Sequence, residues 1–169
     1  MIKNNSVQYY VEGEDERKFI SVLKTDMRLI LPGKVDRLNV IEQKITDARL
    51  RTLQQKTTVI LIFDTDTGQT ATLYENIKKL EASTRVAQVI TIPQIMNLED
   101  ELVRSCNIRD VKALLGSKTL GDFKADLIKV SNLKDKLEQH GFQFHQLWSK
   151  KPLAPYNHIQ NGADKIRLL

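Results

Sequence analysis

The most apolar stretch of the chain is followed at once by acidic residues and a glycine. Residues 58–63 are all aliphatic, aromatic or β-branched, and Asp64 and Gly68 come after them in the run TTVILIFDTDTG. A short apolar run closed by Asp and Gly predicts a strand that is buried on both faces. We therefore expect residues 58–63 to lie in the middle of a parallel sheet, where strands open at their carboxyl ends onto ligand crevices.

Strand and helix patterns alternate around this central strand. Three further strands are predicted, at 6–12, 28–31 and 86–92. Apolar residues at three- and four-residue spacing predict the helices between them, at 14–26, at 39–53 and from Thr70 or Thr72 onward. This order predicts an α/β fold of Rossmann-like type, with a parallel four-stranded sheet and helices on both faces.

The pattern becomes helical after Asn97. Asparagines followed by an aspartate three residues later mark helix starts, and glycines stand where helix ends are expected. We expect three or four short helices in residues 98–140. Residues 142–148 are apolar enough to form a terminal strand, and the polar tail from Lys150 is expected to be partly loose.

Two carboxylates follow the central strand at positions i and i+2. In an extended segment the side chains of Asp64 and Asp66 point the same way, roughly 7 Å apart along the backbone. Both can face one hard cation, and Mg²⁺ prefers a few carboxylate oxygens while it keeps several waters. The alternative is a solvated turn after a core strand, because Asp and Gly are common turn residues.

A second strand ends in an acid followed by glycine, at Glu12 and Gly13. Together the segments YYVEGEDERKFI and VILIFDTDT resemble the TOPRIM domain of topoisomerases, primases, recombination-repair proteins and the overcoming-lysogenisation-defect (OLD) family of nucleases. That family carries Glu-Gly after its first strand and Asp-x-Asp after its third. The resemblance implies a TOPRIM-like α/β domain over residues 1–105, with residues 106–169 as a helical C-terminal extension packed on it.

The resemblance also implies the role of each acid. Asp64 and Asp66 would hold Mg²⁺, for which Mn²⁺ substitutes, and Glu12 would act as a metal ligand or as a general acid or base. Three carboxylates in one crevice repel each other, and a divalent cation relieves that repulsion. Catalysis is accordingly expected from Glu12, Asp64 and Asp66.

Two further acids are candidate metal ligands. Glu16 stands four residues after Glu12, where many TOPRIM domains carry Asp, and OLD-type domains place another acid after the fourth strand. Glu99 is preferred over Glu101 for that position because it falls in the first helical turn nearest the strand end. For both Glu16 and Glu99 the alternative is an acid that only complements a helix dipole.

Composition and net charge indicate which partners the protein can bind. The chain has 41% hydrophobic and 28% charged residues and a net charge of +5 without a basic tail, which is compatible with DNA or RNA binding. Lys150 and Lys151 follow Trp148 and are candidate phosphate contacts; solvated surface lysines are the alternative.

No apolar run or signal-peptide core predicts a membrane segment, and a lone Cys106 predicts a reduced, packed thiol. A cytoplasmic protein is expected.

These observations predict a Mg²⁺-dependent nucleic-acid phosphodiesterase or endonuclease of TOPRIM type, and the OLD resemblance suggests a role in phage or mobile-element defence. The alternative is a non-catalytic TOPRIM module that binds nucleic acid or a partner protein such as an ATPase. A topoisomerase or primase is disfavoured, because no zinc ribbon or recognisable tyrosine cleavage module accompanies the motifs.

Overall fold

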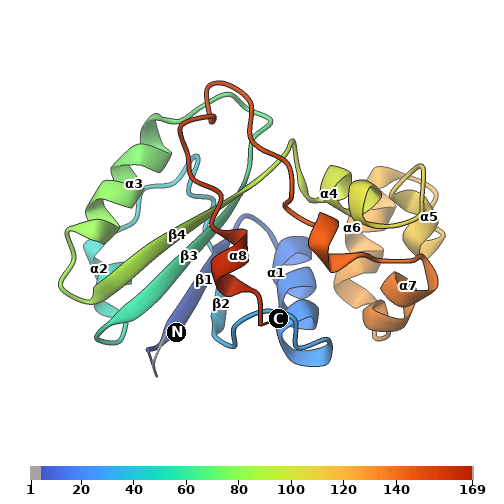
Figure 1. Ribbon diagram of the computed structural model, residues 1–169, viewed down its shortest axis with the longest axis horizontal. Helices are drawn as coiled ribbons and strands as arrows, with labels where there is room; N and C mark the ends of the chain where they lie inside the picture. Colours follow the sequence, from blue (N-terminus) through green and yellow to red (C-terminus); the bar gives the residue numbers. More distant parts are fainter. Residues whose placement is uncertain (1–4, 169) are drawn as a thin grey trace.

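A four-stranded parallel sheet forms the centre of the protein. The computed structural model describes residues 5–168 (Figure 1). The strands are β1 (Val7–Val11), β2 (Lys34–Arg37), β3 (Thr57–Asp64) and β4 (Val86–Gln94). They lie in the order β2-β1-β3-β4, and every neighbouring pair is parallel. Because β3 is buried along its whole length, the predicted central strand and the α/β, Rossmann-like class are confirmed.

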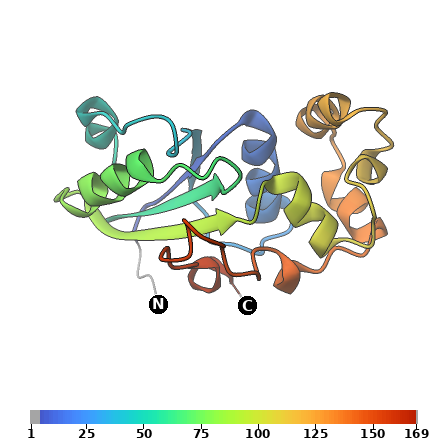
Figure 2. The same cartoon turned by 90° about the horizontal axis from the view of Figure 1, so that it is seen from above.

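Helices cover both faces of the sheet. One face carries α1 (Glu14–Ser21), its π-helical continuation η1 (Val22–Asp26) and α8 (Ala163–Ile166); the other carries α2 (Asp47–Arg51) and α3 (Ala71–Glu81). Alternate residues of β3 separate the two cores, because Ile60 and Ile62 belong to the first and Val59 and Leu61 to the second. Figure 2 shows α3 and α8 on opposite sides of β4.

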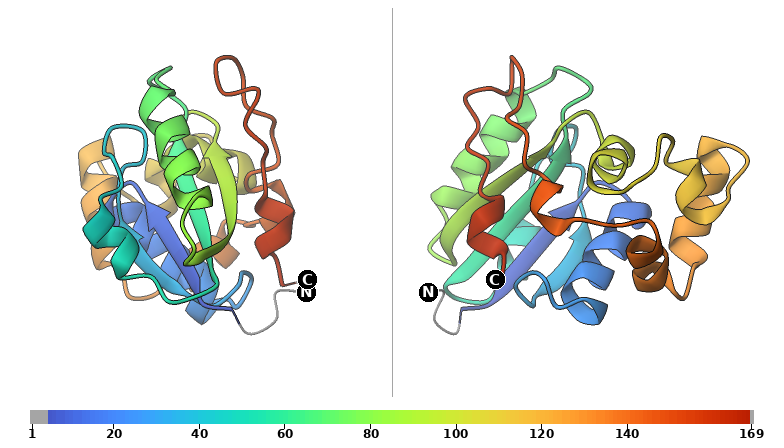
Figure 3. Two further views of the ribbon diagram at one scale, coloured as in Figure 1. Left: turned by 90° about the vertical axis from the view of Figure 1, so that its left-hand side faces the viewer. Right: turned by 45° about the vertical axis from the view of Figure 1, so that its right-hand side comes forward.

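The helices of the C-terminal third lie beside α1. They are α4 (Leu98–Ser105), α5 (Lys112–Leu115), α6 (Leu120–Lys129) and α7 (Leu133–Gln139), which confirms the short helices predicted in residues 98–140. The lobe of α5, α6 and α7 projects to one side of the sheet (Figure 3). Phe123 and Leu127 of α6 are nevertheless buried in the same hydrophobic core as Phe19 of α1. No helix within residues 5–168 has the length and apolar character to cross a bilayer.

The second strand lies later in the chain than its predicted position at 28–31. Ile30 instead forms an isolated antiparallel bridge with Arg167, and β2 begins after the Pro-Gly pair rather than before it. A Cβ at Gly33 would lie 2.6 Å from the carbonyl oxygen of Val7. Glycine is therefore needed where the chain enters the sheet beside β1. The prediction is wrong because β2 is an exposed, charged edge strand, with a weaker apolar pattern than the residues before it.

The helix predicted at 39–53 is reduced to α2. Its first half is a loop fixed by Asn76, a fully buried residue of α3. The Asn76 side chain accepts a hydrogen bond from the Ile45 N–H at 2.8 Å and donates to the carbonyl oxygens of Val40 at 2.9 Å and Gln43 at 2.8 Å. In a helix each of these groups would pair with a backbone group four residues away. The Asn76 side chain takes the place of those partners and holds the segment as a rigid loop.

The terminal strand predicted at 142–148 is also wrong. That segment contains a 3₁₀ turn at Phe144–Gln146. The tail runs along β4 instead, where the Gly162 N–H donates to the carbonyl oxygen of Thr91 at 2.8 Å. An apolar run can satisfy its burial by packing against helices as well as by pairing in a sheet, and the pattern alone does not separate the two cases.

The tail from Lys150 is more closely packed than the expected loose segment. Tyr156 and Ile159 are buried in the core that α2 and α3 cover. The Tyr156 hydroxyl donates to the carbonyl oxygen of Gln69 at 2.8 Å and lies 3.2 Å from the Thr67 hydroxyl. The tail therefore holds the loop that follows the Asp64–Asp66 motif (Figure 1).

Candidate functional site

Two of the predicted site carboxylates meet where β1 and β3 end. Glu12 follows β1 directly, and Asp64 is the last residue of β3. The two strands are adjacent and parallel, with Tyr10 level with Leu61. Both acids therefore reach the same edge of the sheet, and their carboxyl groups come within hydrogen-bonding reach of each other.

Burial and mutual repulsion alter the protonation of this pair. Burial is the main cause that raises the pKa of Asp64 to about 8, and the charge of Glu12 adds to it. Burial also raises the pKa of Glu12, while the hydrogen bond with Asp64 acts in the opposite direction. Two carboxylates this close share a proton near neutral pH, because both cannot ionise without a compensating positive charge.

A second contact of Asp64 comes from β4. Gln94, which is 1% exposed, donates a hydrogen bond from Nε2 to Asp64 Oδ1 at 2.8 Å. The predicted strand stops before Pro93, but β4 continues to Gln94 and places it level with Asp64. Proline is tolerated here because β4 is an edge strand. Gln94 thereby fixes the orientation of the Asp64 carboxyl group.

The first turn of α1 adds two buried acids to the site. The Gly13 N–H donates to Glu16 Oε2 at 2.9 Å, and Glu16 and Asp15 are both nearly inaccessible to solvent. Burial is the largest cause that raises the pKa of Glu16 to about 9, followed by Asp15 and then Asp64. A Cβ at Gly13 would lie 2.8 Å from Asp15 Oδ1 and 3.0 Å from Glu16 Oε2. The glycine after Glu12 therefore lets these acids pack against the backbone.

A lysine from the C-terminal lobe reaches the acids. Lys124 of α6 places Nζ 3.1 Å from Glu99 Oε1 in α4, and the Glu99 side chain is buried. Burial tends to lower the pKa of Lys124, but the charges of Glu99, Asp15 and Glu16 together raise it. Glu99 in turn contributes to the raised pKa of Asp64. The structure thus brings both predicted accessory acids, Glu16 and Glu99, to the electrostatic surroundings of Asp64.

Asp66 differs from the other acids because its side chain is exposed. Its charge nevertheless contributes to the raised pKa values of Glu12 and Asp64. Within residues 5–168, no three His, Cys, Asp or Glu side chains are already arranged to hold one metal ion. The group is therefore a close cluster of carboxylates rather than a complete coordination sphere. Its all-oxygen donor set is the chemistry that Mg²⁺ and Mn²⁺ prefer.

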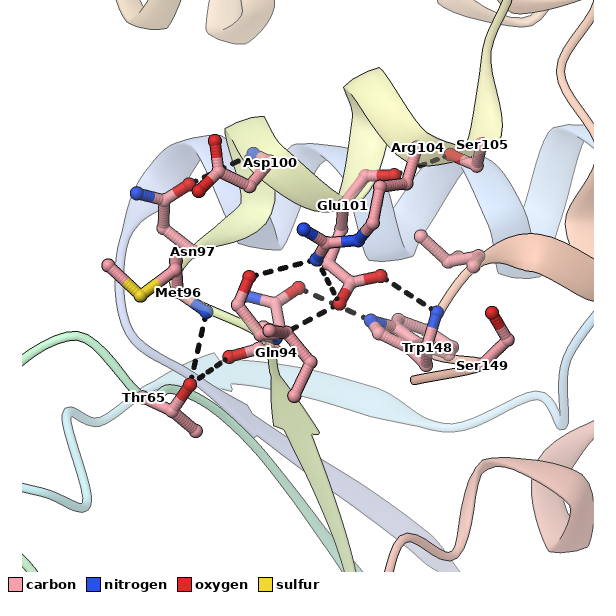
Figure 4. Close-up of polar contacts among 12 residues, drawn as sticks. Thr65, Gln94, Met96, Asn97, Asp100, Glu101, Arg104, Ser105, Trp148 and Ser149 are labelled. Atoms are coloured by element: carbon pink, nitrogen blue, oxygen red, sulfur yellow. Dashed lines mark hydrogen bonds and ion pairs between the residues drawn. The ribbon is translucent and has the colours of Figure 1, made fainter. Parts of the chain in front are cut away.

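Glu101 has a structural role, because it accepts hydrogen bonds from three parts of the chain (Figure 4). Its Oε1 accepts hydrogen bonds from the Ile95 N–H at 3.0 Å and from Arg104 Nη2 at 2.7 Å, and its Oε2 accepts from the Trp148 N–H at 2.9 Å. Trp148 Nε1 also donates to Gln94 Oε1 at 3.3 Å. A chain of contacts therefore runs from Glu101 through Trp148 and Gln94 to Asp64.

The structure does not bring the predicted phosphate contacts Lys150 and Lys151 to the acids. Both are exposed and line a separate hollow of about 290 Å³ with His145, Asn161 and Arg167. The lysine that reaches the acids is Lys124, which the sequence gives no motif to single out.

No protein-family model, curated protein or solved structure matches the chain. The functional assignment therefore rests on the residues of the site and on how the fold places them.

The raised pKa values predict an unusual dependence of stability on pH. Asp64 and Glu16 keep their protons up to about pH 8 and 9 in the folded protein, whereas unfolded carboxyls lose theirs near pH 4. Between these limits the folded state binds more protons. In EDTA the free energy of unfolding should therefore fall as pH rises from 5 to 8, by up to about 1.4 kcal/mol per pH unit for each carboxyl.

Urea denaturation at several pH values measures this slope. Asp64→Asn removes one of the titrating groups, so the variant should show a flatter slope than the parent. Stability that rises across the same pH window in the parent would contradict the assignment of protonated, buried carboxyls.

Proposed function

We propose that the protein is a Mg²⁺-dependent nuclease of TOPRIM type that cleaves phosphodiester bonds in nucleic acid. The observation that carries the proposal is the meeting of Glu12 and Asp64 at the carboxyl ends of adjacent parallel strands. Two buried carboxyls with raised pKa values in one place are costly for a fold, and such groups concentrate at functional sites. The Glu-Gly and Asp-x-Asp signatures at these strand ends support the TOPRIM assignment.

The residues of the site can be given chemical roles. Asp64, Asp66 and Glu12 would hold the cation, with Glu99 and Glu16 as accessory ligands. The bound cation would supply Lewis-acid activation of the phosphate and of an attacking water. Glu12, whose pKa is raised by burial, would accept the proton of that water as the new P–O bond forms. The bond to the leaving sugar oxygen breaks, and that oxygen takes a proton from solvent.

Lys124 supports the same reading of the site. Its ammonium group lies 3.1 Å from Glu99, and the charges of Asp15 and Glu16 also act on it. A phosphate entering beside the acids would therefore meet a positive charge. In the protein without metal, the lysine compensates part of the negative charge that the buried acids create.

One observation favours the second candidate function, a non-catalytic TOPRIM module that binds nucleic acid or a partner protein. The acids in residues 5–168 do not already form a three-ligand metal site. A module that binds its partner without catalysing a reaction has no need of acids already arranged around a metal ion.

An assay of purified protein separates the two candidates. Supercoiled plasmid, single-stranded DNA and RNA are each incubated with the protein in Mg²⁺, in Mn²⁺ and in EDTA. A nuclease should cleave at least one substrate with either metal and none in EDTA. Binding without cleavage in every metal condition would overturn the nuclease assignment and favour the non-catalytic module.

A further inference from the structure

A basic groove lies along the open edge of the sheet. It encloses about 580 Å³ between β2, α1 and α2, and four basic side chains and a single acidic one, Asp36, line it with small residues. The basic residues are Arg17, Lys34, Arg37 and Arg49. The groove has an excess of three positive charges in a protein whose net charge is +5. The lining of the groove is therefore predominantly positive.

The ion pairs of the groove leave much of its positive charge available to a ligand. Lys34 lies 3.2 Å from Asp36, and Arg17 and Arg37 share one acid, Glu14, at 3.4 and 3.1 Å. The side chains of Lys34, Arg37 and Arg17 are still 68%, 57% and 49% exposed. Exposed pairs of this kind are weak, about 0–1 kcal/mol each, so a phosphate can compete for the same cations.

The fourth cation, Arg49 of α2, is oriented by the sheet. Its guanidinium lies over the ring of Tyr10, 5.6 Å from the ring centroid. Tyr10 itself is buried, so its ring offers no stacking surface to a base. The groove therefore presents cations and threonine hydroxyls and lacks the exposed aromatic platform that reads or stacks bases. That combination suits a phosphate backbone rather than the bases of a nucleic acid.

The groove leads to the acidic cluster. Arg37, the last residue of β2, is level with Val11, and Glu12 is the next residue of that neighbouring strand. The chain then continues from Arg37 into the loop fixed by Asn76. This loop carries Glu42, whose charge acts on Glu12, and returns to the groove at α2. One strand end and one rigid loop thus border both the groove and the acids.

We propose that this groove binds the sugar-phosphate backbone of a nucleic-acid strand and directs it past Glu12 to the acidic cluster. The inference rests on the proposed function, because the strand that the groove holds is the substrate that the acids would cleave. Binding through the groove is independent of sequence and of divalent metal, since cations and hydroxyls contact phosphate and no group reads bases.

The test compares two variants of equal net charge. Lys34→Glu with Arg49→Glu reverses two cations of the groove, and Lys118→Glu with Lys134→Glu reverses two exposed lysines beside α5 and in α7, in the lobe at the far end of the molecule (Figure 1). Fluorescence anisotropy with a labelled single-stranded 20-mer is measured in EDTA across a range of salt concentrations. The duplex of the same sequence is measured in parallel.

The groove variant should bind the single-stranded probe at least about tenfold more weakly than the control variant. Its slope of log affinity against log salt should fall by about 1.4, because two phosphate contacts are lost. The Mg²⁺-induced rise in melting temperature should persist in both variants and shows that the acidic cluster is intact. Equal loss of affinity in the two variants, or a parent that does not bind the probe, would contradict the proposal that the groove binds nucleic acid.

Failure of the groove and failure of the nuclease assignment give different results. If the parent binds the strand through the groove but does not cleave it with any metal, the groove is a binding site and the nuclease assignment is wrong. If the Lys34→Glu, Arg49→Glu variant cleaves as fast as the parent, the nuclease assignment stands, but the groove is not the route by which the substrate reaches the acids.

Discussion

Replacing Asp64 and Asp66 together by asparagine should abolish the rise in melting temperature that Mg²⁺ or Mn²⁺ gives the parent. Metal-dependent cleavage should fall by about 10³-fold or more, because a bound cation supplies several kcal/mol of transition-state stabilisation. The metal-free variant should be at least as stable as the parent, since asparagine replaces a buried carboxyl group whose pKa is raised to about 8 and which is costly to ionise. Thermal melting measures the stability of the metal-free and metal-bound protein, calorimetric titration measures metal binding, and a cleavage assay measures the loss of rate.

A matched control for this variant is Asp122→Asn with Asp135→Asn. It neutralises two exposed aspartates of α6 and α7 and changes the net charge equally. Metal binding and cleavage should remain within about twofold of the parent, because both side chains are exposed and the effects of exposed charges are screened by salt. A double variant at Asp64 and Asp66 that binds metal as tightly as the parent would place the metal site elsewhere.

Glu12→Gln should remove nearly all turnover. If the side chain acts as the base, the rate should fall by about 10² to 10⁴-fold with metal affinity close to normal. If it is chiefly a ligand, metal affinity should fall, and excess metal should restore part of the rate. We expect a mixed result, because Glu12 lies within hydrogen-bonding reach of Asp64 and carboxylates this close share a cation. Cleavage titrated against metal concentration distinguishes these outcomes.

Glu14→Gln is the control for this change. Glu14 is two residues from Glu12 in the sequence. Its carboxylate forms exposed ion pairs with Arg17 and Arg37. Its loss should leave the dependence of cleavage on metal concentration unchanged. If Glu12→Gln cleaves at the parental rate under limiting metal, Glu12 takes no part in the chemistry.

The sequence predicts the centre of the sheet and its acids well because both depend on local pattern. Residues 58–63 are all aliphatic, aromatic or β-branched and are closed by Asp and Gly, which favours a strand buried on both faces. Once β1 and β3 are parallel neighbours, Glu12 and Asp64 must reach the same edge. The relative position of these two acids therefore follows from the pairing of β1 with β3.

The rest of the site depends on contacts between distant parts of the chain. Lys124 reaches Glu99 because α6 packs on α1, and no spacing in the sequence encodes that packing. Gln94 could have been found as a polar residue at a strand end, but the proline before it suggests that the strand has already stopped. Likewise β2 is defined by its pairing with β1, although the apolar residues before it look more like a strand.

Crystals of the parent protein soaked with Mn²⁺ give the most direct test of the site. The anomalous signal of manganese locates the ion without reference to activity. We expect a peak within coordination distance of the carboxylate oxygens of Asp64 and Glu12, accompanied by movement of Asp66 toward the ion. Manganese bound only at other positions, with the Glu12 and Asp64 carboxyl groups still hydrogen-bonded to each other, would contradict the metal centre and the mechanism built on it.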